Sequence, residues 1–255
     1  MPIHKVIFRL DFSKPNFEVL DSAGAIMRIM SESLDIKWEE YRNERDSGTV
    51  TGVFANEEKT KYQQLAIQPS TIHFVYEHAI GTEPKDLEES EAYSELFKGA
   101  QLLCDFFKSS LVKRSGIRFT YMSSKSTHDQ VKEFFRGTIE SSLLKGLTEI
   151  LGEPRDFGIA IDGVSEDKLA YHFKAGPYEG LEAEKQFSFI KDNMKQDKEQ
   201  SLIIDLDIYE EDFLLTVRPK IWAKSAVRKC TSMVDHFERM LESSDTKEKS
   251  DVRSK

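Results

Sequence analysis

The stretch Lys113–Met122 reads KRSGIRFTYM, and a later stretch, Leu202–Tyr209, reads LIIDLDIY. In both, apolar and polar side chains alternate with a period of two residues, which is typical of a β-strand with one face toward a core. The polar positions include Arg118 in the first stretch and Asp205 and Asp207 in the second. The two stretches therefore predict neighbouring strands of one sheet, with Arg118 as the cross-strand partner of the aspartates.

The chain on both sides of these stretches carries the same two periodicities. Alternation predicts further strands over residues 3–12, 36–45, 49–55, 62–68, 71–78, 157–162, 168–174 and 201–209, with 212–218 as an extension of the last strand or as another one. Apolar residues at three- and four-residue steps predict helices over residues 17–34, 90–111 and 126–151, and a last helix from Pro219 to about residue 242. The four strands between residues 36 and 78 are predicted to form an antiparallel meander.

The order strand, helix, meander, long helix occurs twice along the chain. We expect an α+β fold of two pattern-repeated halves, 1–112 and 113–242, each an antiparallel meander with a short helix and a long C-terminal helix packed on the sheet. A saddle or helix-grip arrangement, loosely like the TATA-binding-protein fold, would satisfy this order. The junction at 111–114 has no linker composition, so we favour halves that share one core over two separate domains. Residues 243–255 have no apolar face to bury and are expected to be disordered.

Composition narrows the class of protein. The chain has 255 residues, of which 39% are hydrophobic and 32% charged, as in ordinary globular proteins. Its net charge of −9 makes nucleic-acid binding unlikely, because phosphate contacts need a concentrated positive field, although a local basic strip stays open. Cys104 and Cys230 lie in apolar helical patterns without a nearby partner, which favours buried thiols in a reducing compartment. With no signal peptide and no apolar run of roughly 18 residues, we expect a cytoplasmic protein without membrane contact.

The motifs of common catalytic and cofactor sites do not occur in the sequence. It has no phosphate-binding loop, dinucleotide fingerprint, zinc-protease helix, esterase elbow or EF-hand loop. The six histidines form no pair with metal-ligand spacing. We therefore predict no catalytic residue, cofactor or metal ligand of these kinds, while a site of another kind stays open.

The densest group of charged residues offers two interpretations. Asp205 and Asp207 could bind a divalent cation, and Arg114 and Arg118 could receive a phosphate or carboxylate, with Gly116 allowing close approach. Alternatively, the four charges form cross-strand pairs worth roughly 0.2–1 kcal/mol each, and Gly116 marks a β-bulge. We favour the pairs, because no histidine or third acid stands at a supporting spacing.

The same stretches resemble a known family. RSGIRFTYM is similar to the R-x-G-x-R-[YF]-x-N pattern of a sporadically distributed family of uncharacterised prokaryotic proteins of this length, and LIIDLDIY resembles its late D-x-D strand. The closing helix resembles the family's ending, but His236 and Phe237 are adjacent where H-x-x-F-E is expected, and residues 120–122 lack the usual Asn. The resemblance implies an accessory protein of unknown function from mobile or defence-related gene clusters. It supplies no catalytic residues.

Three hypotheses about function follow. The first is a non-enzymatic accessory or protein-interaction protein, with a protein partner or a homodimer. The second is an enzyme or sensor with a small-molecule or metal-binding pocket between helix and sheet, in which the two arginines and two aspartates orient the ligand. The third is a nucleic-acid-binding saddle, which the net charge disfavours.

Overall fold

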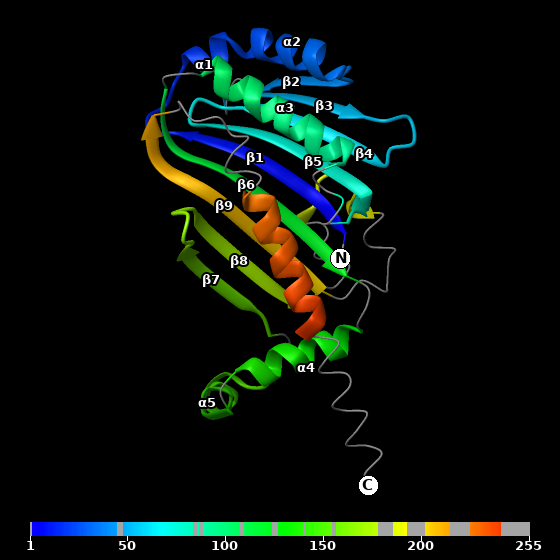
Figure 1. Ribbon diagram of the computed structural model, residues 1–255, viewed down its shortest axis with the longest axis vertical. Helices are drawn as coiled ribbons and strands as arrows, with labels where there is room; N and C mark the ends of the chain where they lie inside the picture. The colour runs from blue at the N-terminus through cyan, green and yellow to red at the C-terminus, as the bar shows by residue number, and fades with distance from the viewer. Residues whose placement is uncertain are drawn as a thin grey trace.

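The computed structural model describes residues 2–44, 48–83, 86, 89–107, 110–123, 127–139, 141–154, 157–177, 186–192, 202–214 and 225–240. These residues form a nine-stranded sheet and six helices (Figure 1), which confirms the α+β class. The strands are β1 (Ile3–Phe12), β2 (Glu40–Glu44), β3 (Thr49–Ala55), β4 (Lys61–Ile67), β5 (Thr71–Thr82), β6 (Leu111–Ser123), β7 (Ile159–Val164), β8 (Ala170–Pro177) and β9 (Leu202–Leu214). The helices are α1 (Glu18–Asp21), α2 (Ala23–Leu34), α3 (Glu91–Phe106), α4 (His128–Thr138), α5 (Ser141–Leu151) and a last one over residues 225–240.

All neighbouring strands of the sheet are antiparallel. The strand order is β2-β3-β4-β5-β1-β6-β9-β8-β7, so the first strand of each expected half, β1 and β6, lie side by side at the centre. From β1 the meander β5, β4, β3, β2 extends to one edge, and from β6 the strands β9, β8, β7 extend to the other. The sheet is continuous across the expected boundary at residues 112 and 113, which both belong to β6.

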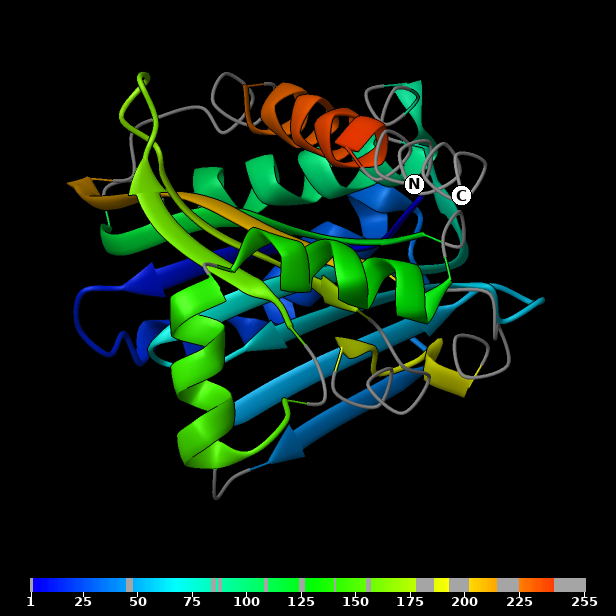
Figure 2. The same ribbon diagram turned by 90° about the horizontal axis from the view of Figure 1, so that it is seen from below.

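One face of the sheet, called the helix face below, packs against the helices. Its alternate strand positions carry large, fully buried side chains such as Phe8, Phe74, Phe119 and Ile204. Burying each of them contributes roughly 1.5–3 kcal/mol to stability. Figure 2, seen from below, shows α3 and helix 225–240 on this side of the sheet. The strand positions that alternate with these buried residues form the opposite face, called the outer face below, which carries Arg118, Asp205 and Asp207.

Aromatic contacts join α4 and helix 225–240 to the sheet. Phe135 of α4 and Phe173 of β8 both pack on Phe237, with ring centroids 6.3 Å and 5.3 Å from the Phe237 ring. Cys104 and Cys230 are buried free thiols, as the apolar patterns predict. Burial raises the pKa of Cys104 to about 12 and raises that of Cys230 as well, so both thiols stay protonated and unreactive.

Two predicted helices are each divided in two. The helix expected over residues 17–34 is interrupted at Ser22, between α1 and α2. The helix expected over residues 126–151 is interrupted at Ile139, whose backbone is extended (φ −89°, ψ 132°). Thr127 caps α4 through a capping box with Gln130, which confirms the predicted cap. The interruption turns α5 away from the axis of α4 (Figure 1).

Other boundaries differ because tertiary contacts override the local pattern. The helix expected to reach Leu111 ends at Phe106, and Leu111 instead pairs with Leu214 in the sheet. The strand expected from Ile36 begins only at Glu40, because the Trp38 indole N–H donates to the Met27 carbonyl (3.1 Å) and holds this segment against α2. The expected extension at 212–218 is continuous with β9 as far as Leu214.

Some expectations fall outside the described residues. They are residues 215–218 of the expected strand extension, the start of the last helix at Pro219 and the disordered tail at 243–255. In the part of the chain that the structure describes, no helix is long and apolar enough to cross a membrane.

Candidate functional site on the outer face of the sheet

The two stretches with alternating charges are hydrogen-bonded neighbours. In the ladder between β6 and β9, Arg118 stands opposite Asp207, Thr120 opposite Asp205 and Arg114 opposite Glu211. The structure therefore brings Arg114, Arg118, Asp205 and Asp207 together on the outer face.

Each arginine binds the aspartate diagonal to it rather than the residue directly opposite. Arg118 Nε donates to Asp205 Oδ1 (2.6 Å) and its Nη2 donates to Oδ2, which makes a two-pronged contact. Arg114 Nη2 donates to Asp207 Oδ2, and the Arg114 guanidinium carbon lies 3.9 Å from the centroid of the Tyr209 ring. The hydrogen bond to Asp205 is the main cause that raises the pKa of Arg118. Both arginines are therefore paired with an aspartate.

Gly116 serves close packing in this cluster. Both ladders of β6 keep their register at Gly116, and the register shift at the start of β6 lies between Val112 and Arg114, in the pairing with β1, so Gly116 itself is not the position of a β-bulge. A Cβ atom at this position would lie 2.7 Å from Tyr209 Cβ and 3.0 Å from the Ile208 carbonyl oxygen. Glycine is needed because the neighbouring strand leaves no room for a side chain.

The arrangement favours charge pairing over metal binding. Both aspartates already accept hydrogen bonds from arginine, and their side chains are only 8% and 19% exposed. Within the described ranges, no group of three histidine, cysteine, aspartate or glutamate side chains could hold a metal ion. The geometry gives the four residues a role in joining β6 to β9.

A second ion pair on the outer face involves residues that the sequence analysis did not single out. Glu77 of β5 is fully buried, and its carboxylate lies 2.9 Å from Lys5 Nζ. The same carboxylate accepts the backbone N–H groups of Ser188 (3.1 Å) and Phe189 (2.9 Å). We call this arrangement of Glu77, Lys5 and the backbone at 188–190 the Glu77 clamp.

The Glu77 clamp holds the segment 186–192 on the outer face. Figure 2 shows this segment, in yellow, on the side of the sheet away from α3. Phe187 and Ile190 are buried against Met122, and the Phe189 ring stacks on Tyr62 at 5.1 Å. Alternation along β5 places Glu77 on the outer face, but no local signal reveals a partner more than a hundred residues away.

A third polar group on this face is neutral. His73 of β5 stands opposite Arg9 of β1 and contacts the Thr71 hydroxyl through Nε2 (3.1 Å). Burial, followed by the nearby charge of Arg9, lowers the pKa of His73. The imidazole is therefore uncharged near neutral pH.

The edge of the sheet at β7 is a different kind of surface. Asp162, the charged residue of this strand, is paired with His172 of β8 (Nδ1–Oδ1, 2.5 Å). Ile161 and Val164 are 46% and 69% exposed. β7 ends the sheet, and among the described residues its outer backbone groups have no hydrogen-bond partner.

A cavity of about 720 Å³ lies on the helix face, between helix 225–240 and the strands β8 and β9. Arg114, Arg118, Asp205 and Asp207 do not line this cavity. Asp205 instead borders a smaller hollow of about 300 Å³ beside β7. The four charged residues therefore do not line the larger cavity, and the hypothesis that they orient a ligand stays a prediction.

No family model, curated protein or solved structure matches the chain. The family resemblance of the β6 and β9 stretches stays a prediction.

Proposed function

We propose that the protein is a non-enzymatic accessory protein that acts by binding another protein chain, and that strand β7 is the binding surface. The observation that carries this proposal is the outer edge of β7, which pairs with no strand among the residues that the structure describes. The polar residues with the greatest potential for catalysis on the outer face are engaged as ion pairs, which supports a binding role.

The edge strand lacks the features that keep other edges from pairing. Its sequence, IAIDGV, contains no lysine, arginine or proline, and its one charged side chain, Asp162, contacts His172 Nδ1 of β8. Proteins commonly protect edge strands with such residues, because open backbone groups pair with other chains. Exposed Ile161 and Val164 add apolar surface at the same edge.

The partner that fits this edge is a second copy of the chain. In an antiparallel pair about a two-fold axis at Ile161, each Ile161 faces its copy, Ala160 faces Asp162, and Ile159 faces Gly163. No like charges then stand opposite each other, and the apolar side chains meet on the helix face. The two sheets would form one continuous sheet through β7.

Light scattering on the purified protein tests the proposal. We expect a dimer at micromolar concentration, and a monomer for Ile161→Lys, which places a charge at the centre of the pair. Ile80→Lys is the matched control, because Ile80 is 74% exposed on β5, which is not an edge strand. A monomeric wild type, or equal dissociation by both variants, would overturn the proposal.

The strand order supports a further proposal about architecture, namely the two pattern-repeated halves in a saddle-like sheet. Each half starts with a central strand, β1 or β6, and adds its last strand, β5 or β9, beside it. An approximate two-fold axis between β1 and β6 would relate the halves.

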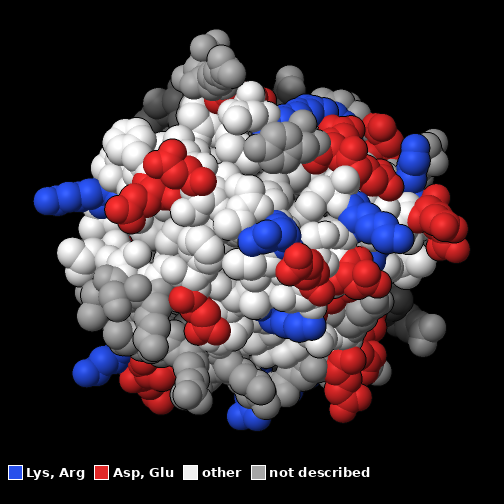
Figure 3. All heavy atoms as spheres, turned by 90° about the horizontal axis from the view of Figure 1, so that it is seen from above, with Lys and Arg blue, Asp and Glu red and all other residues white. Residues whose placement is uncertain are grey.

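The distribution of charge gives no support to a nucleic-acid-binding function. On the face shown in Figure 3, which looks down on the end that carries α2, basic side chains are interspersed with carboxylates.

A further inference from the structure

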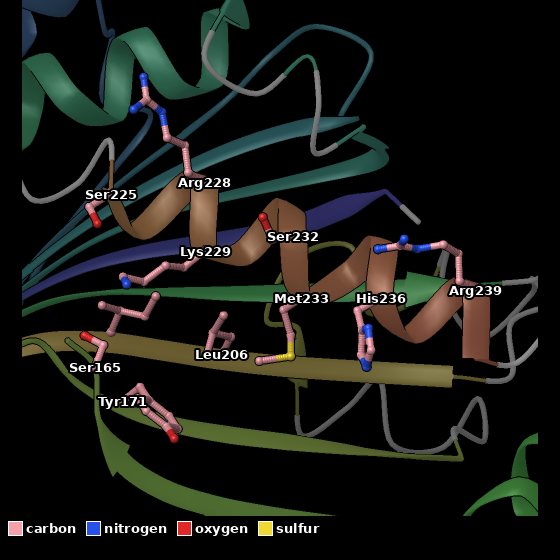
Figure 4. Close-up of a pocket in the computed structure, with 11 residues that line it drawn as sticks. Ser165, Tyr171, Leu206, Ser225, Arg228, Lys229, Ser232, Met233, His236 and Arg239 are labelled. Carbon is pink, nitrogen blue, oxygen red and sulfur yellow. The ribbon is translucent and has the colours of Figure 1, made fainter. Parts of the chain in front are cut away.

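The cavity between helix 225–240 and the sheet has an apolar floor. Leu206 and Ile208 of β9 and Met233 of the helix line it, and Figure 4 shows Met233 directed toward Leu206. Its volume of about 720 Å³ is in the range of pockets that hold small molecules. Such pockets combine an apolar lining with a few polar groups that orient the ligand.

One end of the cavity is polar and already satisfied. Asp167, next to this end, accepts hydrogen bonds from the Ser165 (2.5 Å) and Ser225 (2.6 Å) hydroxyls and lies 3.1 Å from Lys229 Nζ. These hydroxyl hydrogen bonds lower the pKa of Asp167, so the carboxylate is ionised and balances the Lys229 charge. Asp167 and Lys229 therefore offset each other's charge at this end.

The other end presents donors without acceptors. His236 and Arg239, both exposed, line the cavity on the last turns of the helix. In Figure 4 His236 points toward β9, whereas the Arg239 side chain lies on the side of the helix away from β9. Arg239 Nε donates to the Asp235 carbonyl (3.1 Å). Within the described part of the chain, the His236 ring and the terminal nitrogens of Arg239 have no partner. His236 can donate a hydrogen bond in either protonation state, and Arg239 carries a permanent charge.

We propose that this cavity binds a medium-chain carboxylate, a small molecule with an apolar chain and one anionic end. The chain lies along Leu206, Ile208 and Met233, and the carboxylate binds at His236 and Arg239. Apolar contact supplies most of the affinity, and the charge-assisted hydrogen bonds orient the ligand. This site lies on the helix face and does not depend on pairing through β7.

Calorimetric titration with decanoate, below the concentration at which it forms micelles, tests the proposal. We expect one site per chain and at least tenfold weaker binding of decanol, which lacks the charge. Arg239→Gln lowers decanoate affinity at least tenfold, and Met233→Glu, which places a carboxylate on the floor, abolishes binding. Arg28→Gln is the matched control, because it removes one exposed arginine from α2 and leaves binding unchanged.

Vesicles that contain an anionic lipid distinguish a free carboxylate from a lipid surface. We expect the protein not to float with such vesicles, because the site lies between helix and sheet. The proposal is overturned if decanoate does not bind, if decanol binds equally well, if Arg28→Gln weakens binding as Arg239→Gln does, or if vesicles bind and decanoate does not. Unchanged thermal unfolding of the Arg239→Gln and Met233→Glu variants shows that lost binding is not lost folding.

Discussion

The outer face contains two sets of ion pairs that differ in how far they are removed from water. In the Glu77 clamp the side chains of Glu77 and Lys5 are 0% and 12% exposed, and the carboxylate also binds backbone N–H groups of a distant segment. In the pair between β6 and β9 the Arg118 side chain is 42% exposed. The contrast shows that charges on one sheet face can serve two roles. The clamp attaches a segment to the sheet, whereas the Arg118 pair aligns two strands that other contacts already join.

The largest expected effect is at the Glu77 clamp. Glu77→Ala leaves Lys5 and several backbone N–H groups without their acceptor in a buried place, so we expect the free energy of unfolding to fall by about 3–5 kcal/mol. Chemical denaturation measures this loss. Hydrogen exchange at Ser188 and Phe189 should become faster, because the segment is released from the sheet.

A matched control separates the clamp from the loss of charge alone. Glu58→Ala removes the same charge from an exposed turn, and we expect a change within about 0.5 kcal/mol. If Glu77→Ala were equally mild, or if exchange at 188–189 stayed slow, the clamp would not hold this segment.

A smaller effect is expected at Gly116, where β6 and β9 approach closely. Gly116→Ala would place a Cβ atom 2.7 Å from Tyr209 Cβ, so the strands must shift, at a cost of about 1–3 kcal/mol. Gly137→Ala in α4 is the control, because a Cβ atom there meets nothing within 4 Å. That change should stabilise the helix by up to about 1 kcal/mol. Thermal unfolding of the two variants should therefore move in opposite directions, and a shift in the same direction would contradict this account.

Local patterns predict the strands around these sites better than the partners of each charge. The two-residue period is a property of a few neighbouring residues, so β6 and β9 could be recognised from Ile117 and Ile204 and the residues around them. The pairing of Arg118 with Asp205 rather than Asp207 depends on the direction of the side chains, which a pattern does not contain. The burial of Glu77 depends on a segment far along the chain, and the cavity depends on where helix 225–240 lies over β9.

The smallest expected effect is the coupling between Arg118 and Asp205, which a double-mutant cycle measures. Because the Arg118 side chain is 42% exposed, water screens the attraction, and we expect a coupling energy of about 1 kcal/mol or less. The single variants should differ. Arg118→Ala leaves the Asp205 carboxylate, which is 8% exposed, without its donors, whereas Asp205→Ala leaves an arginine that water can solvate. Arg118→Ala should therefore cost more stability than Asp205→Ala. The reverse order, or a coupling as large as that of Lys5 with Glu77 in a parallel cycle, would show that burial is not what separates the two sets of ion pairs.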